Sequence, residues 1–226
     1  MRRLLFIAAL LAGCGVNPLP VPPELGGEIS GSTCLPCDGT IRVAGEPGSA
    51  KNADAVWLVN LDRQSEPLLV PVANDGSFEA LMDALPGDEI RLQARRDELR
   101  SVPLDLVATV DAVLEPAARP LADCFVVEPE LELDDATVGA TSFATLTLSH
   151  DCDTSLTIDS IALRAPAPAF EIAAPVAPFV LAPGETTTVT IQLTPEAAGL
   201  VEEVLLIEVS SPEPDRRPVT LFGIAD

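Results

Sequence analysis

Residues that enzymes use for catalysis are scarce in this chain of 226 residues. Tyrosine is absent, aromatic residues make up 4%, and there is one histidine, His150. A serine-type site needs a histidine beside an acid and an activated nucleophile, and no Gly-x-Ser-x-Gly elbow occurs. Because His150 lies between Ser149 and two nearby aspartates, we expect it to be a solvated loop residue. The sequence therefore predicts no catalytic residues.

Basic residues are also few. The chain has 13 Lys and Arg against 35 Asp and Glu, a formal net charge of −22. Residues 24–120 hold 17 acids and 8 bases, and residues 121–226 hold 18 acids and 3 bases. Such a surface repels nucleic acid and bare anionic lipid headgroups, so nucleic acid is not an expected partner.

Short clusters of acidic residues in the predicted turns offer an alternative role, calcium binding. None of them has the spacing of an EF-hand loop, and solvation and turn formation account for them. His150 and Cys152 lie close together, but two residues are too few to bind zinc. We therefore predict no metal site and no cofactor.

The chain lacks an apolar run long enough to span a bilayer, which takes about 20 residues as a helix. The longest comparable stretch, Leu4–Ala12, follows Arg2-Arg3 and precedes small residues. A positive start, a short apolar segment and a small-residue end are typical of a secretory signal. Residues 1–13 are therefore predicted to be a signal peptide.

The segment Leu11-Ala12-Gly13-Cys14 resembles the lipobox of bacterial lipoproteins. The resemblance implies that Cys14 carries a diacylglycerol and becomes an acylated N-terminus, since two or more chains anchor stably where one does not. An ordinary signal peptide with an incidental cysteine is the alternative. The absence of aspartate after Cys14 favours the outer membrane, so the expected location is the bacterial cell envelope.

Four further cysteines remain, an even number that indicates disulfides in an exported chain. Three connectivities are possible for them, and spacing favours Cys34–Cys37 and Cys124–Cys152. Cys34-Leu35-Pro36-Cys37 could also support thiol–disulfide exchange. No βαβ pattern surrounds it, so a local structural disulfide is the preferred interpretation.

Abundant proline argues against long helices, with 22 in the chain. Short alternating runs separated by Gly, Asp and Pro turns predict an all-β chain. We expect two antiparallel Ig-like β-sandwiches in tandem. The predicted divisions are the signal peptide at 1–13, an anchor and Pro/Gly-rich tether at 14–33, a first sandwich at 34–112, a linker at 113–122 and a second sandwich at 123–226.

Alternation in the first sandwich selects its core. Ile41 and Val43 share one face of a predicted strand, and Phe78, Ala80 and Met82 share a face of another. Residues 55, 57, 59 and 61 fall on one face of a third strand, and residues 90, 92 and 94 on one face of a fourth. The motifs VWLVN, VANDGSFEA and LPGDEIRLQARRDELRS resemble bacterial Ig-like modules of surface and secreted proteins.

The second sandwich carries more specific motifs. They are Val138-Gly139, Leu156-Thr157-Ile158, Phe170-Glu171-Ile172, Leu181-Ala182-Pro183-Gly184-Glu185, Pro195, Gly199 and Val219-Thr220-Leu221-Phe222-Gly223. Their order resembles the Hydin/ASPM/SPD-2 type of domain, a relative of the major sperm protein fold. The resemblance implies an Ig-like sandwich used for binding and scaffolding, without catalytic residues.

Together these patterns predict a non-catalytic envelope lipoprotein that binds or scaffolds a surface protein or glycan. Its other expected partner is the lipid bilayer, through acylated Cys14. Two alternatives remain: a thiol–disulfide exchange accessory protein using Cys34 and Cys37, and a purely structural spacer in an envelope assembly.

Overall fold

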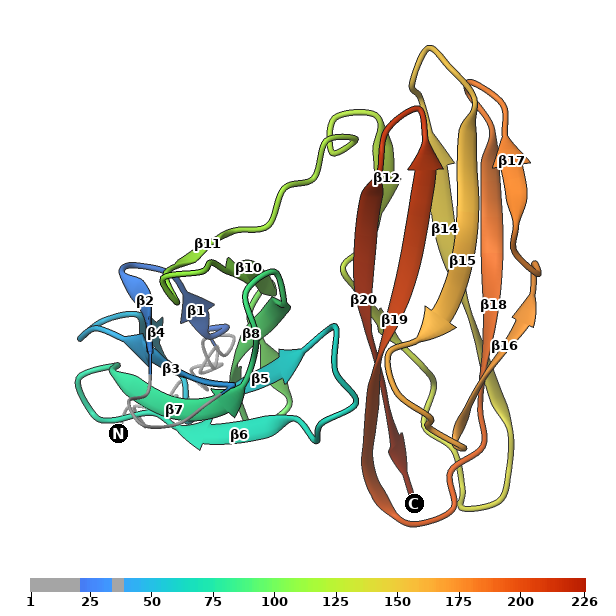
Figure 1. The fold of residues 1–226 in the computed structure, drawn as a ribbon. Coiled ribbons are helices and arrows are strands. Elements are labelled where there is room, and N and C mark those ends of the chain that lie inside the picture. Colours follow the sequence, from blue (N-terminus) through green and yellow to red (C-terminus); the bar gives the residue numbers. More distant parts are fainter. Residues whose placement is uncertain (1–20, 34–38) are drawn as a thin grey trace, which may run out of the picture.

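The computed structural model describes residues 21–33 and 39–226, and that part of the chain contains strands and turns but no helix. No helix there could therefore cross a membrane. The strands form two domains, which Figure 1 shows side by side. The all-β prediction with two Ig-like sandwiches is confirmed.

The first domain packs a three-stranded sheet against a larger one. The sheets have the orders β2-β3-β7 and β11-β10-β8-β5-β6, with β9 on β8, and β1 pairs with β4 beside them. The strands are β1 Glu24–Leu25, β2 Ile29–Thr33, β3 Thr40–Gly45, β4 Ala50–Lys51, β5 Ala55–Asn60, β6 Leu68–Pro71, β7 Phe78–Asp83, β8 Glu89–Arg96, β9 Leu99–Arg100, β10 Leu104–Ala108 and β11 Leu114–Pro116.

The second domain packs a four-stranded sheet, β12-β14-β18-β16, against a five-stranded one, β13-β20-β19-β15-β17. All of its pairs between named strands are antiparallel except β13 with β20. The strands are β12 Phe125–Val127, β13 Glu130–Glu132, β14 Ser142–His150, β15 Leu156–Leu163, β16 Phe170–Ala174, β17 Phe179–Leu181, β18 Thr186–Leu193, β19 Gly199–Ser211 and β20 Asp215–Ala225.

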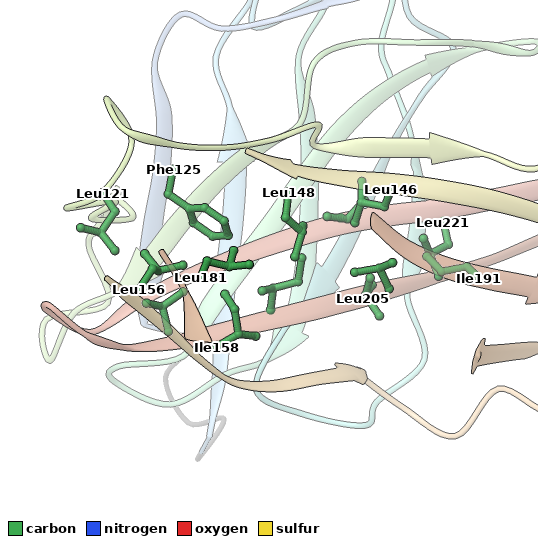
Figure 2. Packing of buried hydrophobic residues seen from close by; sticks show 14 of the residues in the cluster. Leu121, Phe125, Leu146, Leu148, Leu156, Ile158, Leu181, Ile191, Leu205 and Leu221 are labelled. Carbon is green, nitrogen blue, oxygen red and sulfur yellow. The ribbon is translucent and has the colours of Figure 1, made fainter. Parts of the chain in front are cut away.

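Apolar side chains from both sheets fill the second domain. Figure 2 shows ten of them by name: Leu121, Phe125, Leu146, Leu148, Leu156, Ile158, Leu181, Ile191, Leu205 and Leu221. Val189, Ile191 and Leu193 of β18 are fully buried, as strict alternation predicts. With few aromatics available, aliphatic side chains supply most of the buried surface.

The core of the first domain also follows the alternation on β3 and β7. Ile41 and Val43 pack with Phe78, Ala80 and Met82 in one cluster. Strand β5 departs from the expectation that residues 55, 57, 59 and 61 face this core. Trp57, Val59 and Leu61 do share one face, as the alternation predicts, but this face packs against Val204 of the second domain. Val56 and Leu58 fill the core of the first domain instead.

The predicted boundaries of the first domain are wrong at both ends. The expected tether at 14–33 overlaps β1 and β2, which pair with β4 and β3. The expected linker at 113–122 overlaps β11, which pairs with β10, and Leu114 is buried in the core. Both segments look like linkers because they are rich in Gly, Ser, Pro and Ala, and only their non-local pairing makes them strands.

Gly31 in β2 lies where another segment of the first domain comes very close. A Cβ at this position would lie 2.2 Å from the carbonyl oxygen of Ala112 and 2.8 Å from Cγ of Leu114. The close approach of the segment around Ala112 therefore requires a residue without a side chain, and Gly31 is a packing residue of the sandwich.

Substituting Gly31→Ala is expected to destabilise the protein by about 1–3 kcal/mol, since the Cβ must displace backbone. Gly26→Ala is the control, because a Cβ there meets nothing within 4 Å, and it should stay within about 0.5 kcal/mol of wild type. Urea unfolding measures both. Equal stabilities of the two variants would mean that residues 29–33 are a tether after all.

Candidate functional site

The outer face of β8 carries polar residues, yet it is buried. Glu89, Arg91, Gln93 and Arg95 alternate with Ile90, Leu92 and Ala94, and all seven are buried. The apolar set faces the core of the first domain. The polar set faces β19 and β20 of the second domain, which lie on the side turned toward the first (Figure 1). The polar face of β8 is thus part of the interface between the two domains.

Arg91 is the centre of this interface and is 1% exposed. Its Nε and Nη2 donate to the two carboxylate oxygens of Asp105 at 2.7 and 3.0 Å. Nη1 donates to the carbonyl of Pro129 at 3.1 Å and the hydroxyl of Thr220 at 3.0 Å, and Nη2 also donates to the carbonyl of Pro218 at 2.7 Å. All five donors of the guanidinium are used, two within the first domain and three across to the second.

Asp105 and Glu89 share a second cation, Arg119, from the segment that joins the domains. Arg119 donates to Glu89 and, at 3.0 Å, to Asp105. Burial alone would raise the pKa of Asp105, but Arg91 and Arg119 outweigh it and hold that pKa below its usual value. Burial dominates at Glu89 and raises its pKa despite Arg119.

Two further arginines of the first domain bind one carboxylate of the second. Arg95 and Arg100 donate to separate oxygens of Glu202 at 2.6 and 2.5 Å. Their guanidinium groups also lie over aromatic rings, Arg95 at 4.6 Å from the centroid of Trp57 and Arg100 at 3.9 Å from that of Phe222. Stacking and charge pairing together fix both side chains.

Two arginines of the second domain reach in the opposite direction. Arg164 is held by Glu203 and donates to the carbonyls of Arg63 and Ser65 at 2.6 and 3.0 Å. Arg216 donates to Asp62 at 2.9 Å. The contacts therefore run from both domains, and five arginines cross the interface.

A small apolar cluster lies among these charges. Trp57, Val59 and Leu61 pack against Val204, with Leu206 beside them. Because Val56 and Leu58 of the same strand fill the core of the first domain, β5 is covered on both faces. Burial of this cluster supplies the non-directional attraction between the domains, and the arginines supply the geometry.

A cavity of about 250 Å³ opens beside this interface. Its walls come from the turn between β8 and β9, from β13, and from the ends of β19 and β20. Because it uses residues of both domains, it exists only in this relative placement. Domain boundaries are common places for ligand sites.

The predicted site cysteines fall in two groups. The structure has a disulfide between Cys124 and Cys152, with Cα atoms 4.8 Å apart, which is the pairing that spacing favoured. It ties the start of β12 to the loop after β14. Cys14, Cys34 and Cys37 lie outside the described residues, so their predicted lipidation and pairing stay predictions.

His150 is not the solvated loop residue that the sequence suggested. It ends β14, is 1% exposed, and its Nε2 lies 3.0 Å from the carbonyl of Thr154. Alternation along β14 continues to this position and turns the ring inward. No three His, Cys, Asp or Glu side chains gather into a metal site within residues 21–33 and 39–226.

Sequence reasoning missed the interface, although one signal for it exists. Strand β5 is an unbroken apolar run, Ala55-Val56-Trp57-Leu58-Val59, which is typical of a strand covered on both faces. The polar face of β8 gives no such signal, because Glu89, Arg91, Gln93 and Arg95 have the pattern of a solvent-facing surface.

Residues 121–212 match the family model ASH, described as abnormal spindle-like microcephaly-associated, ASPM-SPD-2-Hydin. The match lies within the second domain, whose nine strands begin at Phe125. The predicted resemblance of this domain to the Hydin type is thereby confirmed.

Other similarities are weaker. The PapD-like domain 7 of human CEP192 aligns with a TM-score of 0.42 and 16% identity, over 50% of this chain and 92% of that one. The Vibrio cholerae VesB protease aligns with a TM-score of 0.39 and 11% identity, over 76% and 62%. Protoporphyrinogen oxidase of Schizosaccharomyces pombe is 23% identical over 128 residues, 55% of this chain and 25% of that protein. The chain thus spans a quarter of that relative, and likeness at this level transfers no activity.

Replacing Arg91 should be costly because it removes five buried hydrogen bonds and leaves Arg119 as the one described cation beside the Asp105 carboxylate. We expect Arg91→Met to lower the free energy of unfolding by about 3–5 kcal/mol. Arg42→Met is the control, because Arg42 and Glu79 form an exposed pair that is expected to contribute less than about 1 kcal/mol. Urea unfolding followed by the fluorescence of Trp57 measures both, and equal losses would contradict the central role of Arg91.

The lowered pKa of Asp105 gives a pH dependence with a definite sign. Its stabilising contribution is complete above the pKa of the unfolded chain, about 3.9, and is lost as pH falls through the lower folded value. The stability gap between wild type and Asp105→Asn should therefore be constant above about pH 5 and shrink below about pH 4. Asp111→Asn, at an exposed position, is the control in the same pH series of urea unfolding. A gap that widens in acid would refute the assignment.

Proposed function

We propose that this protein is a non-catalytic binding or scaffolding module held at the bacterial cell envelope by lipid on Cys14. The observation that carries the proposal is the ASH match over residues 121–212. The signal-like leader and the lipobox resemblance support the location. The expected partner is an envelope or surface protein, with a glycan as the alternative.

The interface between the domains supports such a role. A module that presents a binding surface gains from a fixed geometry, because less conformational entropy is lost when the partner binds. Arg91, Arg95 and Arg164 hold the two sandwiches in one relative placement. Surface on both domains is thus offered to a partner as one unit.

The anchor is tested by fractionating cells that express the full chain. Wild type should sediment with membranes and have an intact mass that begins at Cys14 with added acyl chains. Cys14→Ser should appear in the soluble or unprocessed fraction, whereas Cys34→Ser, the matched cysteine control, should stay with the membranes. Acyl chains in the intact mass of Cys14→Ser, or their absence from wild type, would reject lipid anchoring at Cys14.

Binding is tested separately by chemical cross-linking in intact cells, with an unrelated lipidated protein as the control. A defined protein or glycan conjugate should be enriched over that control. A cross-linking pattern identical to that of the control would count against a binding role, whatever the outcome for the anchor.

A further inference from the structure

The cavity beside the domain interface combines an apolar floor with an acidic rim. Leu200 and Ile224, opposite each other on β19 and β20, line it together with Phe222. Leu200 is 51% exposed, a large apolar side chain left open to solvent. The floor continues the outer face of the β19–β20 pair beyond the area that the first domain covers.

Three carboxylates form the rim: Asp97, Glu98 and Glu132. None of them has an ion pair in the part of the chain that the structure describes. The cation that lines the cavity, Arg100, is already paired with Glu202 at 2.5 Å. Arg100 shares that carboxylate with Arg95, so Glu202 does not fully neutralise it. The three rim carboxylates still outnumber this one cation, and the lining carries a net negative charge.

The shape of the cavity is fixed by contacts described above. Asp97 and Glu98 form the tip of a two-residue hairpin, since Arg96 pairs with Leu99. Phe222 is held under the guanidinium of Arg100 at 3.9 Å. The hairpin backbone that carries two rim residues and the aromatic part of the floor are therefore positioned before any ligand arrives, which limits the entropy lost on binding.

Size and charge select one kind of occupant. A volume of about 250 Å³ is below the roughly 300–1,000 Å³ of small-molecule sites, so a single long side chain fits better than a cofactor. Lysine and arginine bury an apolar stem and keep the charge at the end. The net charge of −22 also attracts basic partners over a distance.

We propose that this cavity receives a lysine or arginine side chain of a partner protein. The stem would lie on Leu200, Phe222 and Ile224, and the charged end would meet Asp97, Glu98 and Glu132. This inference rests on the proposed binding function and names the chemistry of the partner segment: a basic residue flanked by aliphatic ones.

The test is an NMR titration of the full chain with the peptide acetyl-Leu-Lys-Leu-amide, following the methyl groups of Leu200 and Ile224. Acetyl-Leu-Gln-Leu-amide is the neutral control peptide. The lysine peptide should shift these methyl signals in a saturable way, bind about fivefold tighter than the neutral peptide, and weaken as salt is added.

A double variant identifies the rim as the source of that preference. Glu98→Gln/Glu132→Gln should weaken the lysine peptide about fivefold and leave the neutral peptide unchanged. Glu115→Gln/Glu213→Gln makes the same change in net charge at exposed positions away from the cavity and should keep wild-type affinity.

Equal affinity for both peptides, no saturable shift, or equal losses in the two double variants would overturn the cavity proposal. Cellular cross-linking to a defined partner would still stand in that case, so the cavity and the general binding function fail separately. Loss of cross-linking with retained peptide selectivity would instead reject the physiological role and keep the site chemistry.

Discussion

The arrangement of the two domains depends on the coordination of one buried cation, Arg91. Its donors reach a carboxylate on β10, a hydroxyl and a carbonyl on β20, and the carbonyl that precedes β13. A buried guanidinium that misses part of this set is unfavourable by several kcal/mol. The four acceptor groups must therefore be in place together, and this condition is met in a single relative orientation of the sandwiches.

Sequence patterns predicted the features that depend on residues close together in the chain. Alternation on β3, β7 and β18 predicts the side chains that fill each core, because strand periodicity decides which face a residue occupies. The turn at Asn74-Asp75-Gly76 likewise follows from local chemistry, with Gly76 at a φ of 83°. The order of motifs in the second domain was enough to indicate its resemblance to the Hydin type.

Features that depend on contacts between residues far apart in the sequence were not predicted. Gly31 looks like a linker glycine until Ala112 is seen against it, and Arg91 looks solvent-facing until Thr220 is seen beside it. Periodicity says that Trp57 lies opposite Val56, but not that a second domain covers it. The cavity could not be predicted either, since its floor and rim come from segments about 100 residues apart in the sequence.

The placement of the arginines divides the molecule into two electrostatic regions. Nine of the eleven basic residues in the described part form ion pairs, and six of them lie in or beside the domain interface. The rest of the surface is left with an excess of carboxylates, in line with the formal net charge of −22. Mobile ions screen exposed charges within about 8 Å at physiological ionic strength but reach buried pairs much less. Rising salt concentration therefore weakens the repulsion between surface carboxylates, while the buried ion pairs between the domains keep most of their strength.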